Sequence, residues 1–311
     1  MANGEPGARS DQAASGRTAL VTGGNGELGY QAALRLAADG RRVLLGSRDA
    51  GRGNVAAAAI RVLVPVSSVA VIGVDLADLE SVRAAAAGLV RDEESLDLLL
   101  NNAGVMAVRS LRLTAQDLEL QIGTNRFGQF ALTGLVLPLL LRRPGSRVVT
   151  ITSVVHRWRR PDFANLRGER RYAPWKAYRA SKLANAVFAV ELDRRLKALG
   201  GSVLRLSAHP GVTATGLGSA GPSLGGGSLL AASTAWGLRL VGQKPLGRLR
   251  AAPEGGARPS GGRGELLRPQ GVAELRGAPG PVPFGRSVHD PSLARRLWSE
   301  SERLTGVSYS R

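Results

Sequence analysis

From Thr18 onward, short apolar runs of strand length alternate with longer stretches that have helical periodicity. The pattern predicts strands over residues 18–22, 42–47, 69–75, 96–101, 147–153 and 203–208. It predicts helices over residues 27–39, 51–64, 79–90, 118–141, 178–199 and 291–304. Strands that are joined by helical crossovers can pair only in parallel. The sequence therefore predicts an α/β fold, a doubly wound parallel sheet whose ligand site lies beyond the carboxyl ends of its strands.

The length of the chain fits one such domain, because 311 residues are enough to bury a substantial core. Aromatic residues make up only 4% of the chain, so Ala, Leu and Val must build that core. We expect a flexible polar tail over residues 1–15 and a single domain over 16–311. Within it, residues 212–290 are rich in Gly, Pro and Ser, and 245–283 show no dependable period. We expect an irregular region there, which is either a segment that covers the substrate or a poorly packed surface loop.

Composition excludes several kinds of site. The chain has no cysteine, which excludes disulfides and thiolate metal sites, and its three histidines are scattered, so we expect no metal. No run approaches the roughly 18 apolar residues of a membrane span, and residues 1–16 lack the apolar stretch of a secretory signal. We therefore expect a cytoplasmic protein with no membrane span. The net charge of +18 comes from scattered arginines and not from one basic helix, so we expect no specific nucleic-acid partner.

A glycine-rich turn, Thr22-Gly23-Gly24-Asn25-Gly26-Glu27-Leu28-Gly29, lies between the first predicted strand and the first predicted helix. In a Rossmann-type fold, glycines at this place let the backbone turn tightly and approach a pyrophosphate, whose charge the helix N-terminus stabilises. The turn predicts dinucleotide binding. Its candidate cofactor-binding residues are Gly23, Asn25, Gly26, Leu28 and Gly29.

The end of the second predicted strand indicates which cofactor is bound. A site that prefers NAD needs an acidic acceptor for the ribose 2′-OH at this place, whereas an arginine can pair with a 2′-phosphate. Here Ser47 occupies the position and Arg48 follows it. These residues favour NADP(H), with Arg48 as the candidate; the alternative is that Arg48 is a surface arginine and Asp49 holds the ribose.

Tyr178 and Lys182 are four residues apart in a predicted helix, so both side chains project from one face. A free tyrosine has a pKa near ~10 and is a poor base at neutral pH, but a neighbouring ammonium favours the phenolate. We expect Lys182 to activate Tyr178 for proton transfer.

These elements together resemble the short-chain dehydrogenase/reductase family. The family's usual turn is TGxxxGxG, and Glu27 stands where its middle glycine would fall, so that a carboxylate would lie beside the pyrophosphate. However, Gly23, Gly26 and Gly29 fit TGxxGxxG, the spacing of the family's extended branch. The departure leaves two hypotheses open. The first is an active NADP(H)-dependent oxidoreductase, and the second is a catalytically weak or silent NADP(H)-binding sensor.

The resemblance implies roles for further residues. Ser153 would hydrogen-bond the substrate oxygen, and Asn125 would support a proton-relay water beside Lys182. The adenine would lie at Asp75 and Leu76. Further cofactor contacts would come from Asn102, Ala103 and Gly104, and from Val212 and Thr215 in a PGxxxT-like segment. Tyr178 and Lys182 would contact the cofactor as well. The reaction would be reversible hydride transfer between the nicotinamide and a small-molecule alcohol or carbonyl, with Tyr178 exchanging the proton.

Residues 155–174 and the C-terminal stretch 291–307 resemble the subgroup of retinol-dehydrogenase-like and protochlorophyllide-reductase-like proteins, which suggests a bulky apolar substrate. The resemblance is missing between residues 244 and 264. Either this stretch is divergent or the reading frame is locally corrupted there. Relatives carry at this place a helix that commonly forms their oligomer interface. The oligomeric state therefore stays open, with a homo-oligomer as one alternative.

Overall fold

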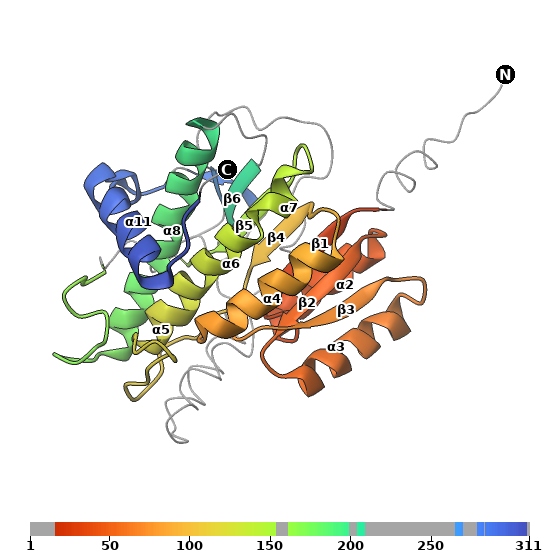
Figure 1. Ribbon diagram of the computed structural model, residues 1–311, viewed down its shortest axis with the longest axis horizontal. Helices are drawn as coiled ribbons and strands as arrows, with labels where there is room; N and C mark the ends of the chain where they lie inside the picture. Colours follow the sequence, from red (N-terminus) through yellow and green to blue (C-terminus); the bar gives the residue numbers. More distant parts are fainter. Residues whose placement is uncertain are drawn as a thin grey trace.

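The computed structural model describes residues 16–153, 161–198, 204–208, 265–269, 279–282 and 284–309. Its centre is one eight-stranded sheet with the order β3-β2-β1-β4-β5-β6-β7-β8 (Figure 1). The strands are β1 (Thr18–Thr22), β2 (Arg42–Ser47), β3 (Val69–Gly73), β4 (Leu98–Asn101), β5 (Arg147–Ile151), β6 (Leu204–Ala208), β7 (Glu265–Pro269) and β8 (Pro279–Val282). Strands β1 to β7 pair in parallel and β8 pairs antiparallel with β7. The doubly wound sheet predicted from the sequence is confirmed, and its strand order reverses between β1 and β4.

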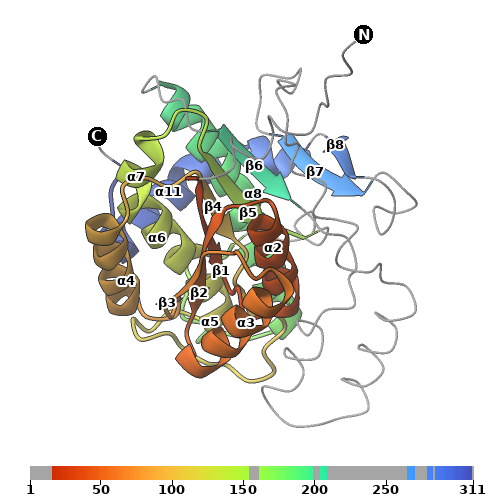
Figure 2. The same cartoon turned by 90° about the vertical axis from the view of Figure 1, so that its right-hand side faces the viewer.

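Helices cover both faces of the sheet (Figure 2). They are α2 (Glu27–Ala38), α3 (Ala50–Leu63), α4 (Leu79–Asp92), α5 (Leu120–Ile122), the π-helix η1 (Gly123–Gly128), α6 (Gln129–Leu135), α7 (Leu137–Leu141), α8 (Pro174–Ala198), the 3₁₀-helix η5 (Arg286–His289) and α11 (Pro291–Thr305). Successive residues of one strand pack into hydrophobic cores on opposite faces of the sheet. Leu20 packs with α4, α6 and α8, while Val21 packs with α2 and α3. Burial on both faces explains why the strands are continuous apolar runs.

The long helix predicted over residues 118–141 is divided in the structure. It consists of α5, η1, α6 and α7, and Pro138 stands in the first turn of α7. Proline has no N–H and clashes with the preceding turn, so α6 ends at Leu135 and a new helix begins at Leu137. The π-helix η1 lies between α5 and α6 and carries Asn125.

Two strands lie within residues 245–283, where the residue pattern shows no dependable period. Strands β7 and β8 extend the sheet beyond β6. Prolines 279 and 281 cannot donate to a neighbouring strand, so β8 fits only at an edge of the sheet, which is where it lies. The tail over residues 1–15, Val212, Thr215 and the stretch 244–264 lie outside the described residues.

The predicted C-terminal helix is confirmed as α11. Asp290 caps its first turn by accepting from the Ser292 and Leu293 amides, and Gly306 ends it with a left-handed φ of 65°. The helix lies along α8 (Figure 1) and places Trp298 against Phe188. Among the helices in the described ranges, none is long and apolar enough to cross a membrane.

Candidate active site

The glycine-rich turn between β1 and α2 is packed too tightly to accept side chains at two of its glycines. Gly23 has a left-handed backbone with a φ of 65°, a conformation that favours glycine. A Cβ atom added to Gly29 would overlap the carbonyl oxygen of Gly23 and would lie 2.6 Å from the Asn102 Nδ2 atom. Asn25 and Leu28 are half-buried on the same turn. The turn is therefore packed closely against its own backbone and against the side chain of Asn102, in the segment that follows β4.

Hydrogen bonds join this turn to that segment. The Thr22 hydroxyl oxygen accepts from the backbone amides of Asn102 and Ala103, both at 3.0 Å. The side chain of Asn102 donates to the Thr22 carbonyl at 2.9 Å. Gln129 donates to the Ala103 carbonyl at 2.6 Å. The backbone and side-chain amides of Asn102 thus fix the position of the turn. Asn102 would therefore act on a bound cofactor through the turn.

The first turn of α2 has no side-chain cap. Its N-cap residue is Gly26, whereas α3, α4 and α11 begin with the aspartates Asp49, Asp78 and Asp290, whose carboxylates accept from first-turn amides. An uncapped helix N-terminus presents free N–H groups and a partial positive charge, which suits an anion. Glu27 is the first residue of α2, and its side chain is exposed.

The residues at the end of β2 differ in whether their side chains have hydrogen-bond partners within the protein. Ser47 is buried, and its hydroxyl donates to the Asp49 carbonyl at 2.8 Å. The Asp49 carboxylate caps α3 by accepting from the Arg52 amide at 2.9 Å. Arg48 is exposed and makes no hydrogen bond or ion pair within the described part of the chain. Arg48 is therefore the free charged side chain at this place.

Asp75 and Leu76 follow β3, as predicted, but their side chains have structural contacts. The Asp75 carboxylate accepts from the Ala77 amide at 2.9 Å, which closes a turn. Leu76 is only 4% exposed and belongs to the core beside α4 and α6. A contact between Leu76 and a bound adenine would therefore come from its main chain.

Tyr178, Ser153 and Lys182 meet at the carboxyl end of β5. Helix α8 begins at Pro174, earlier than the predicted start, so Tyr178 lies in its second turn. The Tyr178 phenol is hydrogen-bonded to Ser153, two residues beyond the end of β5. The Lys182 ammonium lies 5.8 Å from the centre of the Tyr178 ring. The structure thus brings together the three residues that the sequence proposed as a group.

Burial controls the ionisation of this group. Removal from water raises the pKa of Tyr178 to about 12, and the hydrogen bond with Ser153 acts in the opposite direction. Burial lowers the pKa of Lys182 to about 8. Desolvation of the phenol is thus the larger of the two influences on this pKa, and the activation of Tyr178 by Lys182 stays a prediction. The Lys182 Nζ atom donates to the Ile151 carbonyl at 3.1 Å.

Asn125 lies in the π-helix η1 and is fully buried. Its carboxamide oxygen accepts from the Val105 amide at 2.7 Å, and its Nδ2 atom donates to the Val105 carbonyl and to the Ser181 hydroxyl, both at 2.9 Å. A Cβ atom on Gly104 would lie 2.9 Å from the Asn125 Oδ1 atom and 3.7 Å from the Lys182 Nζ atom. Gly104 therefore lets the chain pass between Asn125 and Lys182.

Comparison with protein families agrees with this geometry. The family model described as short chain dehydrogenase matches residues 17–221, which carry the turn, Asn125, Ser153, Tyr178 and Lys182. The chain belongs to the short-chain dehydrogenase family. This is a family of oxidoreductases, and the resemblance inferred from the sequence is confirmed.

Two curated relatives belong to the retinol- and polyprenol-dehydrogenase group. Retinol dehydrogenase 11 of Mus musculus is 43% identical over 196 residues, or 63% of this chain and 61% of that protein. The match therefore spans about three fifths of that relative's length. Polyprenol dehydrogenase of Mus musculus is 37% identical over 306 residues, which cover 94% of this chain and 84% of that protein.

Solved structures show the same fold. An uncharacterised protein from Mycobacterium paratuberculosis aligns with a TM-score of 0.73 and 36% identity, over 96% of each chain. A short chain dehydrogenase from Shigella flexneri, crystallised with NADP, aligns with a TM-score of 0.54 and 26% identity, over 67% of this chain and 83% of that one.

Two polar residues that the sequence analysis did not single out support the short-chain dehydrogenase site. Ser181 accepts from Asn125 and donates to the Tyr178 carbonyl at 2.8 Å. Gln121 is fully buried; it accepts from the Ala107 amide at 2.7 Å and donates to the Tyr172 hydroxyl at 3.1 Å. Ser181 could have been found from its place between Tyr178 and Lys182, but no local signal marks Gln121.

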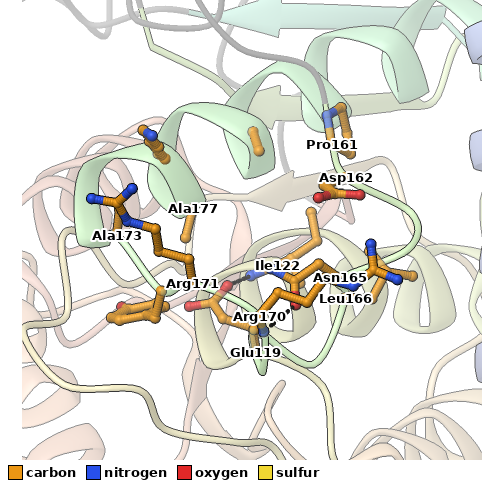
Figure 3. A pocket seen from close by; sticks show the side chains of 14 residues that line it. Glu119, Ile122, Pro161, Asp162, Asn165, Leu166, Arg170, Arg171, Ala173 and Ala177 are labelled. Atoms are coloured by element: carbon orange, nitrogen blue, oxygen red, sulfur yellow. Dashed lines mark hydrogen bonds between the residues drawn. The ribbon is translucent and has the colours of Figure 1, made fainter.

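A cavity of about 250 Å³ lies elsewhere on α8 (Figure 3). Its lining includes Ala173, Ala177 and Ala180 of α8 and its flank, together with Glu119 and Arg171. At about 100° per residue these helical positions face away from the side that carries Tyr178 and Lys182. Both Glu119 carboxylate oxygens accept from backbone amides, so this acid caps α5. The cavity is not the catalytic pocket.

Proposed function

We propose that the protein is an NADP(H)-dependent short-chain dehydrogenase/reductase that interconverts an alcohol and a carbonyl, with a bulky apolar substrate. The observation that carries the proposal is the hydrogen-bonded pair of Tyr178 and Ser153, with Lys182 on the same face of α8.

The chemistry follows from this pair. A bound nicotinamide would supply the hydride in reduction or accept it in oxidation. Ser153 and Tyr178 would both hydrogen-bond the substrate oxygen and hold its carbon in place. The raised pKa of Tyr178 keeps the phenol protonated at neutral pH. That state suits donation of the phenolic proton to the oxygen of a carbonyl as it is reduced.

The residues present fit a dinucleotide. Gly23 and Gly29 bring the turn into backbone contact with the end of β4, and the uncapped first turn of α2 offers amides to a pyrophosphate. The proposal also includes Asn25, Gly26 and Leu28 as cofactor-binding residues of this turn. Val212 and Thr215, which lie outside the described residues, stay part of the proposed cofactor site.

Arg48 supports the preference for NADP(H). Its side chain is exposed and free of described partners, whereas the Asp49 carboxylate is engaged as the cap of α3. An arginine can pair with a 2′-phosphate, whereas sites for NAD carry an acidic residue that accepts from the ribose 2′-OH. The NADP bound to the Shigella flexneri relative agrees with this preference.

The names of the relatives support the apolar substrate. Retinol and polyprenol are both long unsaturated alcohols, and the enzymes named for them are 43% and 37% identical to this chain over the aligned residues. We therefore include apolar aldehydes and ketones of that kind in the proposal.

The test begins with titration of the purified chain with NADPH and NADH. Retinal and dodecanal are then compared with propanal as substrates, with Tyr178→Phe as the matched variant. We expect tighter binding of NADPH, turnover of the apolar aldehydes, and a loss of about 10²-fold or more in kcat for Tyr178→Phe at unchanged NADPH affinity. Failure to bind either nucleotide would overturn the proposal, and so would full activity of Tyr178→Phe.

A further inference from the structure

Arg126 is a fully buried arginine that follows Asn125 in the π-helix η1. It is 1% exposed, and its Nη2 atom donates to the Ser301 hydroxyl of α11 at 2.9 Å. The guanidinium lies 4.8 Å from the centre of the Phe130 ring and 4.4 Å from that of Phe188. Its Nε and Nη1 atoms have no hydrogen-bond partner, and no carboxylate of the described residues pairs with it.

This environment is a poor one for a charge. Burial lowers the pKa of Arg126 to about 9, and the aromatic rings and one hydroxyl replace only part of its hydration. Even a buried ion pair can often be replaced by apolar side chains of similar volume without loss of stability, and Arg126 lacks the attraction of a paired carboxylate. Stability of the fold is therefore not what an arginine contributes at this position.

The two neighbours in η1 are held on different sides. Asn125 is bound to Val105 and to Ser181 of α8, in the catalytic group. Arg126 is bound to Ser301 of α11 and is covered by Phe130 and Phe188. A π-helix turns less per residue than an α-helix, and single π turns inside α-helices are frequent at functional sites. If η1 closed into an α-helical turn, the two side chains could not keep both sets of partners.

We propose that Arg126 is a positioning residue that keeps η1 in its π form and thereby holds the Asn125 carboxamide between Val105 and Ser181. The inference rests on the proposed function for the role of Asn125 in proton transfer beside Lys182. It adds that the C-terminal helix α11, through Ser301, takes part in setting the geometry of the active site.

The test compares Arg126→Met, Arg126→Lys and Arg195→Met in the full chain. Arg195→Met is the matched control, because Arg195 lies over the Trp298 ring at 4.2 Å, in the same aromatic cluster, but does not belong to η1. Three quantities are measured: kcat with KM for NADPH, the melting temperature, and the hydrogen-exchange rate of the Asn125 side-chain amide by NMR.

We expect Arg126→Met to lower kcat at least tenfold at unchanged KM for NADPH, to keep the melting temperature of the control or exceed it, and to accelerate exchange at Asn125. Arg126→Lys should recover part of kcat because it retains the cation. Unchanged exchange at Asn125 in Arg126→Met would overturn the inference. A melting temperature well below that of the control, with faster exchange throughout the fold, would show a structural role only and would also overturn it.

The exchange measurement separates this inference from the proposed function. If the wild-type chain binds no nucleotide and turns over no substrate, the proposed function fails. Selective acceleration of Asn125 exchange in Arg126→Met, absent from Arg195→Met, would still support the positioning role of Arg126.

Discussion

The phenol of Tyr178 and the hydroxyl of Ser153 are hydrogen-bonded, and this bond opposes the effect of burial on the pKa of Tyr178. The two residues come from different elements, α8 and the segment after β5. The proposed site therefore depends on the packing of α8 against the sheet. A contact between the two supports this packing, because the Thr152 hydroxyl donates to the Lys182 carbonyl at 2.8 Å.

The first prediction concerns Ser153→Ala. Loss of the hydrogen bond leaves burial unopposed, so the pKa of Tyr178 should rise further, and the substrate oxygen should lose one donor. We expect kcat to fall by about 10²-fold, with NADPH affinity unchanged. Steady-state kinetics and NADPH titration check this. The exposed Ser68, which contacts Arg42 beside β3, supplies the control Ser68→Ala, and equal kcat values for the two variants would contradict the prediction.

The spacing of Tyr178 and Lys182 was enough to place both side chains on one face, because helical periodicity is a local property. The direction of the pKa shift of Tyr178 could not be predicted in the same way. It depends on how completely α8 is covered by the sheet and by neighbouring segments, and burial of this kind arises only from tertiary packing. Likewise the alternation of strands and helices predicted β1 to β6.

Elements with weak local signals escaped prediction. Strand β8 contains Pro279 and Pro281, which oppose strand formation except at an edge, and the pairing that stabilises it comes from β7. The π-helix η1 lies within a stretch whose apolar residues are spaced as in an α-helix, so this spacing does not reveal the π form. Its form is seen only with its tertiary contacts, such as that between Gly128 and the backbone of Leu76, where a Cβ atom would overlap the Leu76 carbonyl.

The second prediction concerns Gly29→Ala in the glycine-rich turn. The new methyl group would overlap the Gly23 carbonyl, so the turn must move away from Asn102. We expect NADPH affinity to fall at least tenfold and the free energy of unfolding to fall by about 1–3 kcal/mol. Calorimetric titration and urea unfolding measure the two effects. In the control Gly73→Ala, at the end of β3, the methyl group meets nothing within 4 Å, and both quantities should stay near the wild-type values.

The third prediction concerns Arg48→Ala and cofactor choice. If Arg48 pairs with the 2′-phosphate, its removal should weaken NADPH binding about tenfold and leave NADH binding unchanged, because only NADPH carries that phosphate. Titration with both nucleotides at one fixed salt concentration checks this. The neighbouring exposed Arg52 lies in the first turn of α3, so Arg52→Ala controls for loss of general positive charge. A parallel loss of NADPH affinity in both variants would indicate nonspecific attraction.

The last prediction concerns stability at alkaline pH. Lys182 has a pKa lowered by burial to about 8 in the folded chain, against 10.5 for the ordinary value. Between these values the unfolded chain binds a proton that the folded chain has lost, so the free energy of unfolding should rise with pH. Arg126, with a pKa lowered to about 9, acts with the same sign. The raised pKa of Tyr178 acts in the opposite direction, but only above its ordinary value of 10.0.

Urea unfolding between pH 8 and 9.5 therefore avoids the opposing effect of Tyr178, and comparison with Lys182→Met separates the lysine from Arg126. We expect the free energy of unfolding of the wild-type chain to rise in this window by on the order of 1 kcal/mol, with an upper limit of about 1.4 kcal/mol per pH unit for one group. Lys182→Met removes the buried ammonium, so the rise of its free energy of unfolding with pH should be smaller than that of the wild-type chain. Its stability at pH 7 should be reduced less than by the loss of a cation that forms an ion pair. Identical slopes for the two proteins would mean that Lys182 keeps its ordinary pKa, and that water reaches the ammonium in solution.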